Sequence, residues 1–189
     1  MLAELEKLRK QLSAFDRVSV GFPGVIKHGK TLTAANLNAQ WIGFPLQTTL
    51  HHRWKRPVHL ANDAAVQGYG AISGKGVELT ITLGTGMGSA LFIDGHLCAG
   101  LELGHHPWHK GKTYEEYLGR KGFKKLGTKR WNRMLQKAIE QTAKTFNWDH
   151  LYIGGGNAKE IDFKLPENVT VVSNEDGLYG GVALWRYQG

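Results

Sequence analysis

The glycine-rich turn between two apolar segments, within residues 79–92, constrains the fold of this chain most. Residues 79–83 and 87–92 are predicted to form buried strands, because both are short and dominated by apolar side chains. A turn this tight calls for residues that tolerate positive φ and leave backbone N–H groups uncovered. Because converging N–H groups bind phosphate, the segment predicts a hairpin whose phosphate-binding residues are Gly84, Thr85, Gly86 and Gly88.

Length and composition predict one large domain or two small lobes with a real hydrophobic core. The chain has 189 residues, of which 41% are apolar and 21% charged, as in ordinary globular proteins. Its single cysteine, Cys98, excludes an internal disulfide and a Cys-rich zinc site, and is expected to be buried and inert. The sequence shows no signal peptide and no apolar run of membrane-spanning length, so we expect a cytoplasmic protein with no membrane partner.

Hydrophobic periodicity predicts strands and helices that alternate along the chain, which indicates the α/β class. Besides the hairpin at 77–93, strands are expected at residues 17–25, 58–61, 150–153 and 169–172, with regular structure also from 97 to 103. Helices are expected at residues 1–12, 44–54, 64–71, 114–118, 129–147 and 177–187, and a loop at 31–41.

Positive charge is concentrated in one stretch, residues 110–137. The stretch holds ten basic residues and two glutamates, so it carries the whole formal net charge of +8. Most charge runs are solvated helix faces, but this concentration favours a polyanion site held by Coulomb attraction and counterion release. The candidate residues are Lys110, Lys112, Lys121, Lys124, Lys125, Lys129, Arg130 and Arg133.

The pair Asn62-Asp63 follows a short apolar strand upstream of the hairpin. An aspartate at a strand end is able to act as a general base, with the preceding asparagine fixing a hydroxyl group. Taken alone, the pair is more typical of a helix cap before Ala64.

Several motifs in order resemble the ROK-type sugar kinases and, within them, the polyphosphate glucokinases. The resemblance covers the chain from Val18 onward. It is carried by Gly21-Phe22-Pro23-Gly24, Thr33-Ala34-Ala35-Asn36-Leu37, Trp41-Ile42-Gly43, Asn62-Asp63-Ala64, Leu83-Gly84-Thr85-Gly86-Met87-Gly88-Ser89-Ala90, Glu102-Leu103-Gly104-His105, Gly111-Lys112-Thr113-Tyr114-Glu115-Glu116-Tyr117, Trp131-Asn132-Arg133, Tyr152-Ile153-Gly154-Gly155-Gly156-Asn157 and Val172-Ser173-Asn174-Glu175.

The resemblance implies a two-lobed actin-like (RNase H-like) ATPase fold, with residues 1–63 as the remainder of the N-terminal lobe and 64–189 as the C-terminal lobe. It implies transfer of a phosphoryl group from polyphosphate or ATP to the 6-hydroxyl of glucose, with Asp63 as the base and Mg²⁺ accompanying the donor. A homodimer is also implied. The implied sugar-binding residues are Asn36, Asn62, Glu102 and His105, and those near a nucleotide base are Gly154, Gly155 and Gly156. Taken singly, Asn36 also suits a turn, His105 a structural histidine, and the three glycines a strand-to-helix turn.

The chain departs from the family pattern in two places. Many ROK proteins hold a structural zinc on one histidine and three cysteines, whereas here His105 is followed by His106 and His109 without cysteine, so we expect no zinc. Family members also begin with strands carrying Asp-x-Gly-Gly, and this chain opens in the helix that follows them. We therefore expect a truncated first lobe with an open edge at residues 18–24. The chain is then a fragment or mis-started form of a longer kinase, or a shortened relative with altered function.

Three functions remain open on sequence grounds. The first is a polyphosphate- or ATP-dependent glucokinase. The second is a catalytically impaired relative that binds sugar or polyphosphate. The third, a nucleic-acid-binding module, is suggested by the isoelectric point of about 9.6, but no recognition motif accompanies the charge, so we expect no nucleic-acid partner.

Overall fold

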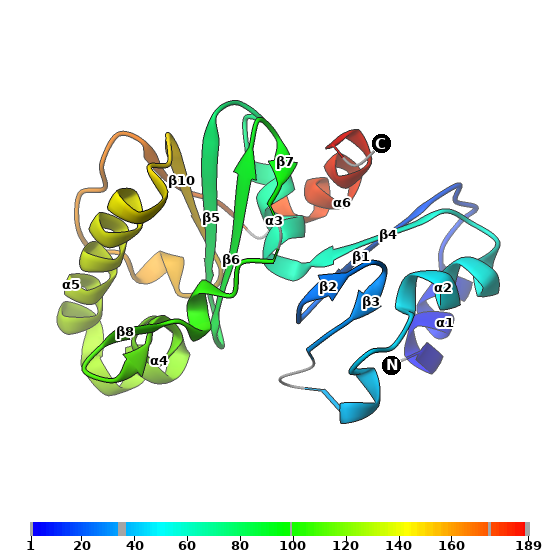
Figure 1. The fold of residues 1–189 in the computed structure, drawn as a ribbon, viewed down its shortest axis with the longest axis horizontal. Helices are drawn as coiled ribbons and strands as arrows, with labels where there is room; N and C mark the ends of the chain where they lie inside the picture. The colour runs from blue at the N-terminus through cyan, green and yellow to red at the C-terminus, as the bar shows by residue number, and fades with distance from the viewer. Residues whose placement is uncertain (1, 34–36, 99, 174, 188–189) are drawn as a thin grey trace.

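The computed structural model describes residues 2–33, 37–98, 100–173 and 175–187. It has a larger part built on a five-stranded sheet and a smaller part built on a parallel pair of strands (Figure 1). The larger sheet has the order β11-β10-β5-β6-β7, in which β10 runs parallel to β5 and β11, and β6 runs antiparallel to β5 and β7. These strands are Val77–Leu83 (β5), Met87–Ile93 (β6), His96–Leu97 (β7), His150–Gly154 (β10) and Val169–Val171 (β11).

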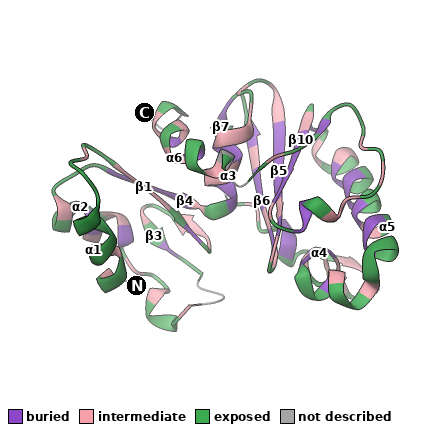
Figure 2. Ribbon diagram, turned by 180° about the vertical axis from the view of Figure 1, so that it is seen from behind, coloured by how far each residue is buried: buried purple, intermediate pink, exposed green. Residues whose placement is uncertain are grey.

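Helices cover both faces of the larger sheet and give three layers. On one face, α5 (Arg120–Phe146) packs the fully buried Trp131 into the core that contains Leu79. On the other face, α3 (Asp63–Ala71) packs against Phe92. Alternation of side chains along β5 and β6 supplies apolar residues to both cores, and the buried positions lie along these strands (Figure 2).

The smaller part holds β1 (Val18–Phe22) parallel to β4 (Val58–Asn62), paired residue by residue from Val18 opposite Val58. Among the described residues β1 pairs with β4 alone, which confirms the open edge expected there. The other elements of this part are α1 (Leu2–Gln11), β2 (Ile26–Lys27), β3 (Lys30–Thr31), η1 (Ala39–Trp41) and α2 (Leu46–Trp54).

The last helix, α6 (Asp176–Tyr187), lies against α3 and β1 and so touches both parts (Figure 1). A Cβ atom at Gly180 would overlap the Val66 carbonyl oxygen, which shows how closely α6 approaches α3. Trp185 Nε1 donates a hydrogen bond of 2.8 Å to Ser19 Oγ on β1. The chain end therefore ties the two parts together.

The remaining elements follow β7 in the larger part. They are η2 (Leu103–His105), β8 (Pro107–His109), β9 (Lys112–Thr113), α4 (Tyr114–Leu118) and η3 (Ala158–Glu160). Thr113 and Glu116 form a reciprocal capping box at the start of α4, which explains why so short a helix is defined.

The expected strands and helices are confirmed, with two differences. The helix predicted at 129–147 is the part of α5 beyond Gly127, whose φ of 70° breaks the helical path, and a further helical segment from Arg120 to this bend was not predicted. Glycines at 122 and 127 lower the helix propensity of this segment, and tertiary packing stabilises the helix there. Regular structure predicted to 103 ends at Leu97. No helix among the described residues is long and apolar enough to span a bilayer.

Glu78 is a fully buried carboxylate on β5 that organises the loop before it. It accepts hydrogen bonds from the backbone N–H groups of Ser73, Gly74 and Lys75 at 2.7, 2.8 and 3.2 Å. Tyr152 on β10 donates its hydroxyl to the same carboxylate at 3.0 Å. Burial, with the Glu78 carboxylate next in importance, raises the pKa of Tyr152 to about 12.

We expect Glu78→Ala to lower the free energy of unfolding by about 3 kcal/mol, because three backbone N–H groups and the Tyr152 hydroxyl lose an acceptor that is itself fully buried. Tyr152→Phe removes a single donor and is expected to cost only about 1 kcal/mol. Urea unfolding of both variants checks the order. A larger loss of unfolding free energy in Tyr152→Phe than in Glu78→Ala would show that Glu78 stabilises the protein mainly through the Tyr152 hydroxyl and not through the loop.

Candidate functional site

The turn of the β5–β6 hairpin offers two backbone donors to an anion. The N–H of Gly84 donates to the Gly86 carbonyl at 3.0 Å and closes the turn, and the N–H of Met87 donates to Glu115 at 3.0 Å. Within the described residues, the N–H groups of Thr85 and Gly86 make no hydrogen bond. Two successive uncovered N–H groups make this turn a candidate site for an anion.

Two of the three glycines of this turn serve close packing and none has positive φ, so the prediction of positive φ here was wrong. None of the three has φ in the left-handed region. A Cβ atom at Gly86 would overlap the carboxylate of Glu115, and one at Gly88 would lie 2.8 Å from the Ala64 Cβ atom on α3. Gly84 faces open space.

Asp63 is the first residue of α3, directly after β4, and this helix packs against the hairpin at Gly88. Asn62 caps the helix, since its Oδ1 accepts the Ala64 N–H at 2.9 Å, and Asp63 Oδ1 accepts the same N–H at 2.8 Å. The Asp63 side chain is exposed, yet the protein mass around it still removes enough water to raise the pKa of its carboxyl. Hydrogen bonding to the Ala64 N–H opposes this effect. Asp63 therefore has the properties of a proton acceptor beside an anion-binding turn.

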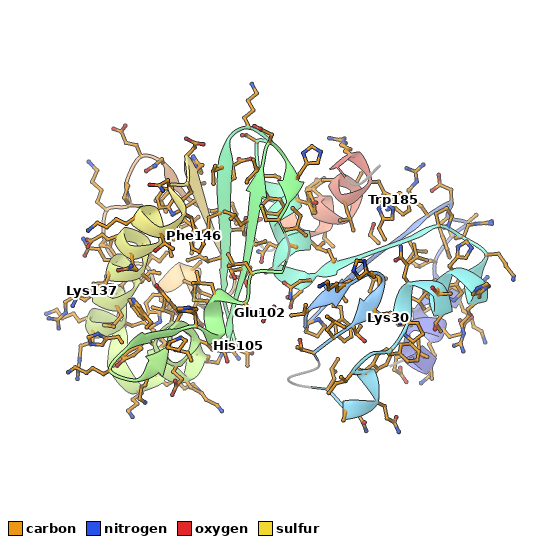
Figure 3. The ribbon with its side chains drawn as sticks, viewed as in Figure 1. Lys30, Glu102, His105, Lys137, Phe146 and Trp185 are labelled. Atoms are coloured by element: carbon orange, nitrogen blue, oxygen red, sulfur yellow. The ribbon has the colours of Figure 1, made fainter. Side chains whose placement is uncertain are left out.

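His105 lies between two carboxylates near the same turn. Its Nδ1 is 3.6 Å from Glu102 Oε2, and its Nε2 is 4.0 Å from Glu115 Oε2. Figure 3 shows Glu102 and His105 on the side of the larger part that faces the smaller one. The sequence analysis missed Glu115 as a site residue. Its signal was its place within the family motif of residues 111–117.

A cavity of about 390 Å³ lies between the two parts and brings Asn62 and Glu102 together. Its walls come from β4, α3, β6, β7 and the β2–β3 hairpin. Asp63 and His105 do not line it, and the predicted sugar ligand Asn36 lies outside the described residues. The cavity is of the size of a small-molecule site with polar groups from several elements.

The triple glycine ends β10 beside the hairpin. Gly155 has φ of 87° and packs against the Leu83 backbone, and Asn157 Nδ2 donates to the Gly84 carbonyl at 3.3 Å. A Cβ atom at Gly154 would lie 2.6 Å from Gln67 Nε2, whereas Gly156 faces open space. Packing thus accounts for two of these glycines, and a role near a nucleotide base stays a prediction for all three.

The basic stretch does not form one face. A second cavity, of about 420 Å³, is lined by Lys110, Lys112, Lys125, Arg130, Arg133 and Lys137. Lys121, Lys124 and Lys129 are exposed but do not line it. The bend at Gly127 and the β8–β9 turn produce this division, which helical periodicity alone does not predict.

The described residues contain no cluster of three metal-ligating side chains. His105, His106 and His109 therefore do not assemble into such a cluster. Asp63 and Glu115 are carboxylates beside the turn, on separate elements. Oxygen ligands of this kind suit Mg²⁺ that keeps waters and is carried mainly by donor phosphates.

Comparison with known proteins shows what this chain resembles. A sequence model of the ROK family matches residues 1–143. The polyphosphate glucokinase of Mycobacterium tuberculosis (strain CDC 1551 / Oshkosh) is 32% identical over 167 residues, covering 82% of this chain and 62% of that protein. The polyphosphate glucokinase of Mycobacterium leprae is 28% identical over 179 residues, covering 86% and 55%. The chain thus spans between 55% and 62% of the length of these curated relatives.

Solved structures match the fold over nearly the whole chain. The inorganic polyphosphate/ATP-glucomannokinase from Arthrobacter sp. strain KM superposes with a TM-score of 0.80 at 30% identity, covering 99% of this chain and 79% of that one. A ROK family glucokinase from Streptomyces griseus, in complex with glucose and AMPPNP, gives a TM-score of 0.72 at 19% identity, covering 99% and 87%. The expected α/β fold of ROK kinases, the actin-like ATPase fold, is confirmed.

We expect the stability difference between wild type and Asp63→Asn to depend on pH. Because burial raises the pKa of Asp63, its carboxyl contributes stability that is fully present below its ordinary value of 3.8 and is lost as pH rises through the higher folded value. The free energy of unfolding of wild type minus that of the variant should therefore fall from acid to neutral pH. Urea titrations at several pH values measure it, and a difference that grows with pH would contradict the raised pKa.

Proposed function

Because this chain belongs to the ROK family, we propose that it is a sugar kinase that transfers a phosphoryl group from inorganic polyphosphate or ATP to the 6-hydroxyl of glucose. The observation that carries this proposal is the position of Asp63, which directly follows β4 and begins α3, the helix that packs against the β5–β6 hairpin at Gly88. The related proteins support this choice of donor and acceptor, because they include polyphosphate glucokinases and a polyphosphate/ATP-glucomannokinase.

In the proposed reaction the sugar occupies the cavity between the two parts. Asn62 and Glu102 present an amide and a carboxylate there, and these groups bind hydroxyls. Asp63 accepts the proton of the 6-hydroxyl as that oxygen attacks the terminal phosphorus of the donor. The bond from that phosphorus to the bridging oxygen breaks, and the shortened donor leaves with the electron pair. Phosphoryl transfer asks little of a protein beyond this alignment and charge neutralisation.

The turn supplies part of that neutralisation through the N–H groups of Thr85 and Gly86. Mg²⁺, held chiefly by the donor phosphates, would supply the rest by offsetting charge between their oxygens. His105 lies between Glu102 and Glu115, 3.6 Å and 4.0 Å from their carboxylate oxygens, and its role in this proposal is to position the two side chains.

A second candidate is a protein that binds sugar or polyphosphate without transferring phosphate. It is favoured by the open edge of β1, which pairs with β4 alone among the described residues. A coupled assay of glucose 6-phosphate formation with Mg²⁺, run with polyphosphate and ATP in parallel, separates the two. Product with either donor supports the kinase, and binding without product in a folded sample supports the second candidate.

Asp63→Asn is expected to reduce transfer at least about 1000-fold while leaving glucose affinity within about threefold, because the amide keeps the shape and loses the base. Turnover and equilibrium glucose binding measure the two effects separately. Turnover close to wild type would remove Asp63 from the role of base.

Glu102→Ala is expected to raise the KM for glucose at least about tenfold, because a carboxylate that binds sugar hydroxyls is lost. Glu115→Gln keeps an oxygen acceptor for the Met87 N–H and is expected to raise KM less. An unchanged KM in Glu102→Ala would place the sugar elsewhere. Glu140→Gln, at an exposed position on α5 that lines neither cavity, serves as the control.

A further inference from the structure

Six basic side chains line the second cavity, and five of them make no hydrogen bond or ion pair among the described residues. Three segments meet around it: the β8–β9 turn, the start of α5 and the part of α5 beyond the bend at Gly127. The bend lets two helical segments of one chain face the same hollow. Figure 3 shows Lys137 on the outer side of α5, away from Glu102 and His105. We call this cavity the basic pocket.

Its charge is almost wholly uncompensated. Glu116 is its one carboxylate, and it pairs with Lys112 at 3.8 Å. The other five basic side chains make no hydrogen bond or ion pair within the part of the chain that the structure describes, namely Lys110, Lys125, Arg130, Arg133 and Lys137. Like charges around one hollow repel one another, and a bound polyanion would turn this repulsion into attraction.

The helix that lines the basic pocket also contacts the phosphate turn. The N–H of Arg120, the first residue of α5, donates to the Gly84 carbonyl at 2.8 Å. At a rise of about 1.5 Å per residue, Lys125 lies only about 8 Å further along the helix. A phosphate chain whose end sits at the turn therefore needs only a few more phosphates to enter the pocket.

We propose that the basic pocket anchors the non-reacting part of an inorganic polyphosphate chain, while the terminal phosphate occupies the turn at Thr85 and Gly86. This inference rests on the proposed function for its ligand. It locates the donor chain in one hollow and leaves Lys121, Lys124 and Lys129 outside it. The geometry favours polyphosphate over nucleic acid, because a duplex needs cations along an extended surface and these surround about 420 Å³.

The test compares two triple variants of the same helix with equal loss of charge. The pocket variant carries Lys125→Gln, Arg130→Gln and Arg133→Gln, and the matched variant carries Lys121→Gln, Lys124→Gln and Lys129→Gln. The affinity of the full chain for long-chain inorganic polyphosphate is measured by calorimetry at several salt concentrations. We expect the pocket variant to bind at least about tenfold more weakly, with its salt slope reduced by about 2, because about 0.7 per lost phosphate contact is expected for a single strand. The matched variant should stay within about threefold of wild type.

Equal losses in both variants would overturn the proposal, because the effect would then follow total charge and not the pocket. So would single-stranded DNA that displaces polyphosphate as effectively as polyphosphate itself. Circular dichroism and thermal unfolding establish that each variant is folded, and Arg133→Lys, which keeps the charge, should retain most of the affinity. Binding is measured without turnover. A protein that binds polyphosphate in the pocket but makes no product would therefore contradict the proposed kinase activity and not the proposed polyphosphate anchor. A wild-type chain that phosphorylates glucose with ATP and binds no polyphosphate overturns only the anchor.

Discussion

The close approach of α3 to both the β5–β6 hairpin and α6 is the constraint on which this structure depends. Three glycines permit it. A Cβ atom at Gly68 would lie 2.6 Å from a ring carbon of Phe92, one at Gly88 would lie 2.8 Å from a methyl carbon of α3, and one at Gly180 would overlap the backbone of α3. Interiors this dense transmit any displacement to their neighbours. Because Asp63 begins α3, these contacts fix the distance between the candidate base and the anion-binding turn.

The candidate base Asp63 is kept apart from the cations of the basic pocket, and this separation favours its role as a proton acceptor. Burial dominates the raised pKa of Asp63, and no lysine or arginine among the described residues contributes to it. A cation beside this carboxylate would lower its pKa and weaken it as a base. The cations gather instead around the basic pocket, and uncharged N–H groups lie at the turn. In the proposed function, the protein attracts a polyanion without neutralising its base.

Local signals in the sequence predicted the strands, the hairpin and the pair Asn62-Asp63, because apolar periodicity and turn chemistry act over a few residues. What escaped prediction depends on three-dimensional contacts. The early start of α5 relies on Trp131, whose Nε1 donates to the Leu118 carbonyl at 3.0 Å across the bend. The division of the basic stretch follows from the same bend. Glu115 joins the site only because a glycine at 86 lets the hairpin reach it.

The helix cap and the catalytic pair, which compete as explanations of Asn62-Asp63 in the sequence, are one arrangement in the structure. Asn62 accepts the Ala64 N–H with Oδ1 and donates from Nδ2 to the Gly24 carbonyl at 3.2 Å. The cap thereby joins the first turn of α3 to the loop after β1 in the smaller part. A second lone pair on Oδ1 remains for a substrate hydroxyl. Because the same side chain starts the helix, links the two parts and faces the cavity, loss of the cap would move the base as well as unwind a turn.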